Sequence, residues 1–167
     1  MAYLKDNSDK YHIDPARVFA CGFSAGGHLA AMLGTLWRET PQGALAKPAA
    51  TILCYPVISF GEYAHAGSLA NLAGGDEALA RRLSLELRVD GDTAPAFLWA
   101  TADDAPVPAM NALLYAQALA GQGIPYALHV FPEGVHGLSL ATELTGPVNV
   151  EAQAWFGLAM EWIARFQ

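Results

Sequence analysis

The chain has 167 residues, of which 53% are hydrophobic and 15% are charged, and its net charge is −7. A chain of this length fits one domain that buries about 70% of the surface exposed by its unfolded form. The acidic balance argues against a nucleic acid partner, because a phosphate-binding surface needs clustered basic side chains. No apolar run is long enough to cross a membrane, and residues 1–17 lack the features of a secretory signal, so we expect a cytoplasmic protein.

Short apolar runs alternate with helical patterns along the chain. In chain order, the sequence predicts a strand at 17–23, a helix at 25–37, a strand at 50–57, a strand at 96–101, a helix at 109–121, a strand at 126–131 and a helix at 148–166. The runs are nearly continuous in apolar residues, as in strands that are covered on both faces. The alternation predicts a three-layer α/β/α domain with a mostly parallel sheet, because parallel neighbours need crossover connections.

Residues 61–95 interrupt this alternation. They are rich in turn-forming residues and contain short helical patterns at 68–72 and 76–87. No interdomain linker is evident, so we interpret residues 1–167 as a single domain and residues 61–95 as an insertion over one end of the sheet.

The two cysteines, Cys21 and Cys54, each lie within a predicted strand. A free thiol in an apolar run usually packs as a small hydrophobic side chain. We therefore expect both cysteines in the core, rather than in a disulfide or as reactive thiols.

The segment Gly22-Phe23-Ser24-Ala25-Gly26 has the pattern G-x-S-x-G at the junction of the first predicted strand and helix. This is the pattern of a nucleophile elbow, a tight turn that we expect to leave no room for a Cβ on either side of the serine. At the start of a helix, the Ala25 N–H would face the oxyanion that forms during acyl transfer. The alternative is that Ser24 is a plain N-cap of that helix.

An acid and a histidine follow at the ends of later predicted strands. Asp103 and Asp104 follow the third strand, and His136 lies in a glycine-flanked loop after the fourth. A serine hydroxyl becomes an effective nucleophile when an imidazole accepts its proton and a carboxylate orients that imidazole. We favour Asp103 over Asp104 as this carboxylate, and Glu133 is a weaker candidate.

The other histidines have structural interpretations. His28 lies one helical turn beyond Ser24 and is expected to pack or to form a hydrogen bond, and His129 is expected in the core. His12 and His65 are expected on the surface or in loops. Neither H-E-x-x-H nor C-x-x-C occurs, so we expect no metal site.

These segments resemble the α/β-hydrolase superfamily, and more closely the acetyl xylan esterase and feruloyl-esterase-like group related to the dienelactone hydrolases. The resemblance runs through most of the chain and is carried by "GFSAGGHLA", by "TADD" followed by "VP", and by "HGL". It implies an esterase that hydrolyses carboxylic esters, such as acetylated or feruloylated carbohydrates, through an acyl-enzyme on Ser24 with Asp103 and His136. No cofactor is implied.

The resemblance covers the C-terminal portion of that fold. In the family, earlier strands precede the nucleophile strand, and a His-Gly-Gly loop among them supplies a second oxyanion N–H. The resemblance therefore implies a truncated sheet without the first strands, with the strand at 17–23 at an exposed edge through which copies of the chain could form a homo-oligomer. The alternative function is a hydrolase fragment with weak or no activity that needs self-association or a complementary chain. A peptidase of the same superfamily is a minor alternative.

Overall fold

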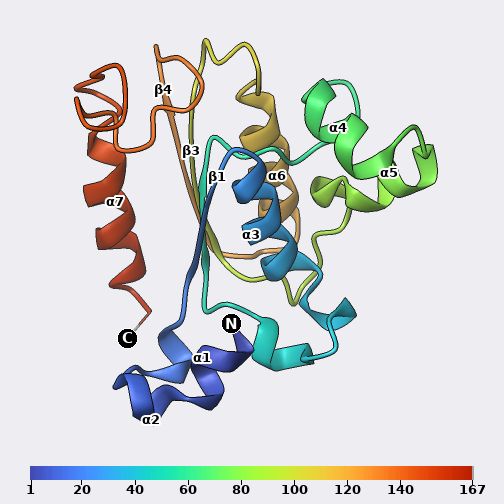
Figure 1. Cartoon of the computed structure of the whole chain (residues 1–167), viewed down its shortest axis with the longest axis vertical. Coiled ribbons are helices and arrows are strands. Elements are labelled where there is room, and N and C mark those ends of the chain that lie inside the picture. The colour runs from blue at the N-terminus through green and yellow to red at the C-terminus, as the bar shows by residue number, and fades with distance from the viewer. Residues whose placement is uncertain (167) are drawn as a thin grey trace.

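The computed structural model describes residues 1–166, and its centre is a four-stranded parallel sheet whose strands lie side by side in chain order (Figure 1). The strands are β1 (Ala20–Phe23), β2 (Thr51–Cys54), β3 (Ala96–Thr101) and β4 (Tyr126–Phe131). In register, Phe23 lies opposite Cys54, and Cys54 lies opposite Trp99. All four predicted strands are confirmed, and their carboxyl ends form one edge of the sheet.

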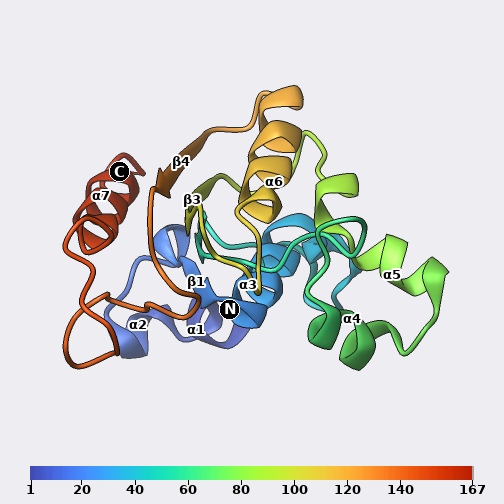
Figure 2. The same ribbon diagram turned by 90° about the horizontal axis from the view of Figure 1, so that it is seen from above.

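Helices cover both faces of the sheet (Figure 2). Helices α3 (Ala25–Thr35) and α6 (Met110–Gly121) cover one face, and α7 (Ala154–Ile163) covers the other. The predicted three-layer α/β/α arrangement is therefore confirmed. Two short helices, α1 (Ala2–Asp6) and α2 (Ser8–Tyr11), lie beyond the amino ends of the strands (Figure 1).

Two apolar cores lie on the two faces of the sheet. The core under α3 and α6 contains Leu53, Leu98 and Tyr115, and the core under α7 contains Trp99 and Trp155. The rings of these two tryptophans are stacked, with centroids 5.3 Å apart. Every residue of β3 is buried, which explains the continuous apolar run at 96–101.

Strand β1 lies at one edge of the sheet, and among the described strands it pairs only with β2. Its face toward α7 is only partly covered, because α7 packs mainly over β3 and reaches β1 through the Trp155 ring, 5.9 Å from the Phe23 ring. Cys21 is consequently exposed, and the Phe23 side chain keeps 37% exposure, while Cys54 is buried. The prediction that both cysteines lie in the core is right for Cys54 and wrong for Cys21.

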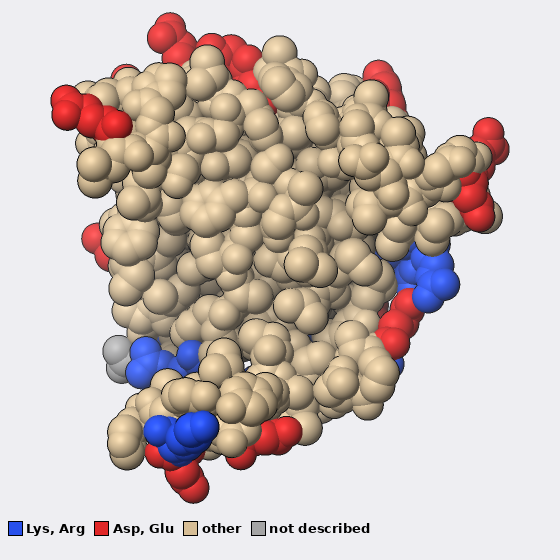
Figure 3. Space-filling view, in the orientation of Figure 1, with Lys and Arg blue, Asp and Glu red and all other residues tan. Residues whose placement is uncertain are grey.

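The surface over the β1 edge has little charge. Figures 1 and 3 look onto this edge, and the Lys, Arg, Asp and Glu side chains visible in Figure 3 lie around the margins of the face rather than at its centre. None of the helices in residues 1–166 combines the length and the apolar character that a membrane crossing requires.

Residues 61–95 form α4 (Ala66–Ala73), α5 (Glu77–Leu83) and a 3₁₀ helix at Leu85–Leu87. This segment lies beside α3 and α6 (Figures 1 and 2). Leu69 and Leu83 pack against Val57 and Val107, which follow β2 and β3, so the segment covers part of the carboxyl edge of the sheet. A pocket of about 760 Å³ lies between α4 and α5.

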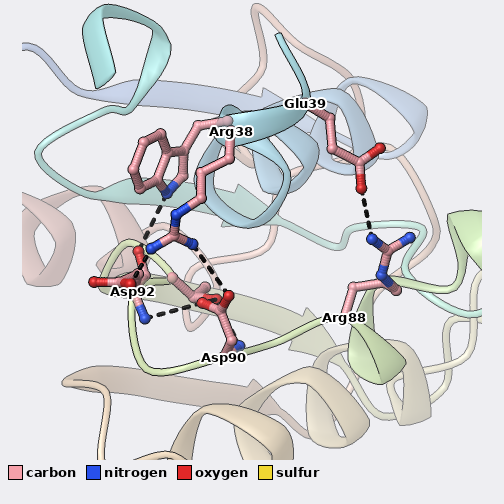
Figure 4. A network of polar contacts seen from close by, with 7 residues as sticks. Arg38, Glu39, Arg88, Asp90 and Asp92 are labelled. Carbon is pink, nitrogen blue, oxygen red and sulfur yellow. Dashed lines mark hydrogen bonds and ion pairs between the residues drawn. The ribbon is translucent and has the colours of Figure 1, made fainter. Parts of the chain in front are cut away.

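Ion pairs connect the segment after α3 to the loop before β3 (Figure 4). Arg38 pairs with Asp90 at 3.1 Å and also with Asp92, and Glu39 pairs with Arg88 at 2.6 Å. All five side chains keep 30% or more of their surface exposed, so each pair contributes about 0.2–1 kcal/mol at most. The network fixes a loop at the amino edge, opposite to the edge that carries Ser24.

Candidate active site

Ser24 occupies the sharp turn between β1 and α3. Its φ of 54° and ψ of −120° are rare for a residue with a side chain. The turn is held by the Ser24 N–H, which donates to the Cys54 carbonyl at 3.0 Å, and by the Ser24 carbonyl, which accepts from Gly27 N at 2.9 Å and Val57 N at 3.1 Å. Neighbouring backbone thus maintains a conformation that an isolated serine would avoid.

Glycines allow the close approach of backbone segments at this turn. A Cβ on Gly22 would collide with the Gly26 carbonyl and would lie 2.8 Å from Gly27 N, and a Cβ on Gly27 would lie 2.8 Å from the Cβ of Pro56. A Cβ on Gly26 would meet nothing within 4 Å. The expectation of a steric requirement on both sides of Ser24 therefore holds for Gly22 and is wrong for Gly26, because the second close approach falls one residue later, at Gly27.

The Ser24 side chain faces a histidine and does not cap α3. Its Oγ lies 2.7 Å from Nε2 of His136, and it makes no capping hydrogen bond to the helix. Nδ1 of His136 lies 2.7 Å from Oδ2 of Asp104. Because the Asp104 carboxylate can only accept, Nδ1 carries the proton and Nε2 is left to accept from the Ser24 hydroxyl. These contacts contradict the N-cap alternative.

The carboxylate beside His136 belongs to Asp104 and not to Asp103, so the preference for Asp103 as the orienting acid is not met by the geometry. The Asp104 side chain is 1% exposed, and its Oδ1 accepts from Val107 N at 2.9 Å, which turns it inward beneath the histidine. Asp103 is exposed, and its Oδ1 accepts from Gly134 N at 2.6 Å. The two side chains diverge because the chain turns immediately after β3.

The Glu133 alternative is also not supported. In the described part of the chain, its carboxylate makes no hydrogen bond, and only its backbone carbonyl is engaged, by Asn149 Nδ2 at 2.7 Å. Glu133 therefore lies in the loop of His136 without orienting the imidazole.

Tyr55 is a site residue that sequence reasoning missed. It directly follows β2, has a φ of 36°, and packs edge-on against the His136 ring with centroids 5.1 Å apart. Its hydroxyl accepts from Ser139 N at 2.9 Å, and the Ser139 carbonyl accepts from Trp155 Nε1 at 2.8 Å. Burial raises the pKa of the Tyr55 hydroxyl, which therefore stays protonated. Its place just past the carboxyl end of a strand was the available signal.

Ala25 is the first residue of α3, and its N–H forms no hydrogen bond within residues 1–166. The first N–H groups of a helix have no intrahelical acceptor, and they carry the positive end of the helix dipole. The Ala25 N–H therefore fits the oxyanion donor that the elbow pattern predicts, and its role remains a prediction.

The remaining histidines lie outside the Ser24 site. His28 is 3% exposed, and its Nε2 donates to the Leu83 carbonyl at 2.9 Å, as expected for a packed histidine. His129 is partly buried on β4, His12 is exposed, and His65 caps the start of α4. Within residues 1–166, no three His, Cys, Asp or Glu side chains gather as a metal ion would require.

Comparison with known proteins places this geometry among hydrolases. The model of the BD-FAE family matches residues 1–52, the part of the chain that contains the elbow and α3. The chain is 39% identical over 150 residues to endo-1,4-beta-xylanase B of Butyrivibrio fibrisolvens, a match that covers 84% of this chain and 24% of the relative. It is 33% identical over 146 residues to acetylxylan esterase of Xylanibacter ruminicola, covering 83% of this chain and 29% of that protein.

A solved structure extends the similarity to nearly the whole chain. The acetyl ester-xyloside bifunctional hydrolase of Caldicellulosiruptor lactoaceticus superposes with a TM-score of 0.89 at 40% identity, and the match covers 98% of this chain and 62% of that one. The chain thus spans less than a third of the two relatives and under two thirds of the solved structure. The parallel sheet, the elbow and these matches together show a chain of the α/β-hydrolase fold that resembles the acetyl xylan esterase group.

Proposed function

We propose that the chain hydrolyses carboxylic esters through an acyl-enzyme on Ser24. The observation that carries the proposal is the relay of two 2.7 Å contacts, from Ser24 Oγ to His136 Nε2 and from His136 Nδ1 to Asp104 Oδ2. The relay supplies a nucleophile, a base and an orienting carboxylate at the carboxyl edge of the sheet, where ligands of α/β folds bind.

The first half of the reaction forms the acyl-enzyme. Ser24 Oγ attacks the ester carbonyl carbon as His136 Nε2 accepts the hydroxyl proton, and the Asp104 carboxylate stabilises the imidazolium. The oxyanion of the tetrahedral intermediate faces the Ala25 N–H. The intermediate then collapses, the C–O bond to the alcohol breaks, and Nε2 returns its proton to the departing oxygen.

The second half releases the acid. A water molecule replaces the alcohol, and His136 Nε2 accepts its proton while the water oxygen attacks the acyl carbon. Collapse of this second intermediate returns the proton to Ser24 Oγ and frees the carboxylic acid. The cycle uses no redox step, and its protons pass through one imidazole.

The substrate class we propose is an acetylated carbohydrate, with other small aliphatic or aryl esters, including feruloylated sugars, as further candidates. Support comes from the relatives, one of which is an acetylxylan esterase and another an acetyl ester-xyloside hydrolase. Likeness of fold alone does not determine the substrate, so the proposed substrate class is taken from these two relatives.

Labelling with a fluorophosphonate probe tests the nucleophile. We expect the probe to modify Ser24 in the folded chain and to leave the Ser24→Ala variant unlabelled, and we expect hydrolysis of p-nitrophenyl acetate to depend on Ser24. A folded chain that neither reacts with the probe nor hydrolyses the ester would refute the proposal. An amide substrate turned over faster than the ester would favour the peptidase alternative.

A second candidate function is a weakly active hydrolase unit that needs a second copy of the chain or a complementary chain. Two observations favour it: β1 is an edge strand with an exposed thiol at Cys21 and a partly exposed ring at Phe23, and the surface over this edge is largely uncharged (Figure 3). Ala25 N–H is the one oxyanion donor that the elbow pattern predicts within residues 1–166, and removal of one donor lowers the rate by about 10² to 10³-fold in serine hydrolases.

Sedimentation tests this second candidate. We expect the chain to associate at high protein concentration, and we expect Cys21→Lys to reduce association, because a lysine on an edge strand opposes strand pairing. A monomeric profile at every concentration, with a Ser24-dependent rate typical of esterases, would argue against it.

A further inference from the structure

We propose that Asp103 and Thr101 are positioning residues that hold the His136 loop in place by binding both backbone groups of Gly134. This inference rests on the proposed function, because it assigns these two residues a role in the reaction of Ser24. It assigns Asp103 to the support of the loop, whereas the sequence had suggested that Asp103 orients the His136 imidazole directly.

The loop after β4 has a backbone that needs external support. Between residues 132 and 141, φ is positive at Gly134 (151°), Gly137 (87°), Ser139 (52°) and Ala141 (57°). Residues with a side chain rarely adopt such angles, and glycine loses more conformational freedom than any other residue when it becomes fixed. Since His136 lies in the middle of this loop, contacts with the rest of the fold must determine where its imidazole stands.

Two of these contacts come from the end of β3 and meet on one residue. Thr101 Oγ1 donates to the Gly134 carbonyl at 2.7 Å, and Gly134 N donates to Asp103 Oδ1 at 2.6 Å. A Cβ on Gly134 would lie 2.7 Å from Cγ2 of Thr101, so the approach is close enough to require glycine. The N–H and the C=O of Gly134 are thus both bound at the carboxyl end of β3, the C=O by its last residue, Thr101, and the N–H by Asp103 just beyond it.

The same short segment carries Asp104, which contacts the imidazole. Residues 101, 103 and 104 therefore hold the loop at two points only two residues apart, Gly134 through its backbone and His136 through its Nδ1. A shift of Gly134 would move His136 relative to both Asp104 and Ser24. Displacements of about 1 Å at a catalytic group reduce rates by up to about 10²-fold.

The loop also has anchors other than those at Gly134. Tyr55 and Trp155 bind the N–H and the C=O of Ser139, and Asn149 binds the Glu133 carbonyl. Loss of one anchor at Gly134 should therefore loosen the loop without unfolding it, which makes the effect measurable in folded protein. Thr101 is buried and Asp103 is exposed, so we expect the larger effect from Thr101.

Four variants of the full chain test the proposal. Asp103→Ala removes the acceptor, Asp103→Asn keeps an oxygen acceptor without the charge, and Thr101→Val removes the donor with little change of shape. Glu133→Ala is the matched control, because it removes an exposed carboxylate from the same loop. In the described part of the chain this carboxylate makes no hydrogen bond. Each variant is assayed for kcat and KM with p-nitrophenyl acetate and for hydrogen exchange of the peptide that contains Gly134.

For Asp103→Ala we expect kcat to fall about fivefold with KM unchanged, and exchange at Gly134 to accelerate, because a charge-assisted hydrogen bond is lost. Asp103→Asn should keep most of the wild-type kcat and most of the wild-type protection of Gly134 from exchange. Thr101→Val should lower kcat by about tenfold. In the double variant Thr101→Val/Asp103→Ala the losses should not multiply, because both act through Gly134. Glu133→Ala should match the wild type in both measurements.

Wild-type kcat and wild-type exchange in Asp103→Ala would overturn the proposal. So would a loss of kcat in Asp103→Asn as large as that of Asp104→Asn, which would make Asp103 a second orienting acid. If the wild-type chain shows no Ser24-dependent hydrolysis, the proposed function fails, and the exchange measurement still decides whether Asp103 and Thr101 hold Gly134.

Discussion

Oδ2 of Asp104 lies 2.7 Å from Nδ1 of His136, while the carboxylate of the preceding residue, Asp103, binds the backbone of Gly134. Two adjacent acids at the end of one strand therefore serve the same loop in different ways. Asp104 contacts the imidazole, and Asp103 contacts the chain that carries the imidazole.

Asp104→Asn is expected to lower kcat for p-nitrophenyl acetate by about three to four orders of magnitude. An amide favours the wrong tautomer of His136 and does not stabilise the imidazolium. Steady-state kinetics on protein that keeps the near-ultraviolet circular dichroism of the wild type provides the measurement. A variant within tenfold of the wild type would show that another group orients His136.

Gly22→Ala and Gly26→Ala should have opposite effects on stability. The new Cβ at Gly22 would collide with the backbone of Gly26, so we expect the free energy of unfolding to fall by about 3 kcal/mol. At Gly26, within α3, the new Cβ meets no atom, and alanine should raise the free energy of unfolding by about 0.5–1 kcal/mol. Urea denaturation of both variants checks the prediction, and equal effects would contradict the elbow packing.

Acid should destabilise the chain in part through His28. Burial lowers the pKa of this imidazole below its usual value of 6.5, although the Leu83 carbonyl opposes the shift. Between the folded pKa and 6.5, the unfolded chain binds more protons than the folded chain, so the free energy of unfolding falls as the pH drops through this window. Above pH 6.5, His28 is neutral in both states, and the stability that is lost in acid is fully present.

Replacement of His28 by glutamine isolates this contribution, because glutamine can still donate to Leu83 and does not titrate. We expect urea denaturation between about pH 5 and pH 8 to show a flatter pH dependence for His28→Gln than for the wild type. Identical slopes would indicate that His28 becomes protonated without cost in the folded state.

Tyr115→Phe should lower the free energy of unfolding by about 1–2 kcal/mol. The Tyr115 hydroxyl lies 2.6 Å from Thr35 Oγ1 in the core between α3 and α6, and burial raises its pKa to about 12. Without it, Thr35 Oγ1 loses its partner and stays buried. The double variant Tyr115→Phe/Thr35→Val should lose less than the sum of the two single variants, and strict additivity in thermal or urea unfolding would contradict the pairing.

The sequence predicted the layers of the fold because apolar runs of strand length record burial on both faces. The run at 96–101 matches β3 residue by residue, and 126–131 matches β4. The run at 17–23 predicted more burial than β1 has, since an apolar run by itself does not show which strand lies at an edge. The family resemblance did indicate this edge, and β1 lies there. Cys21 was placed in the core because its prediction rested on the apolar run and not on the edge position.

The sequence allowed us to predict which strand ends carry the candidate site. It did not allow us to predict how the side chains at these ends are oriented. Ser24 and His136 were identified by turn patterns that require particular residue types. The choice between Asp103 and Asp104 depends on the direction of each side chain after β3, which the hydrogen bond from Val107 N to Asp104 determines. Tyr55 carries no pattern of its own, and only the position of β2 beside β1 brings it to the histidine.

Ser24, Tyr55 and Ser139 share positive φ angles, and all three lie in the turns around the His136 imidazole. Such angles raise the energy of the native backbone by roughly 1–3 kcal/mol each, and they persist only where the surroundings enforce them. The reactive edge of this sheet is therefore preorganised at the expense of conformational stability. Variants that relax these turns should therefore gain stability and lose turnover together.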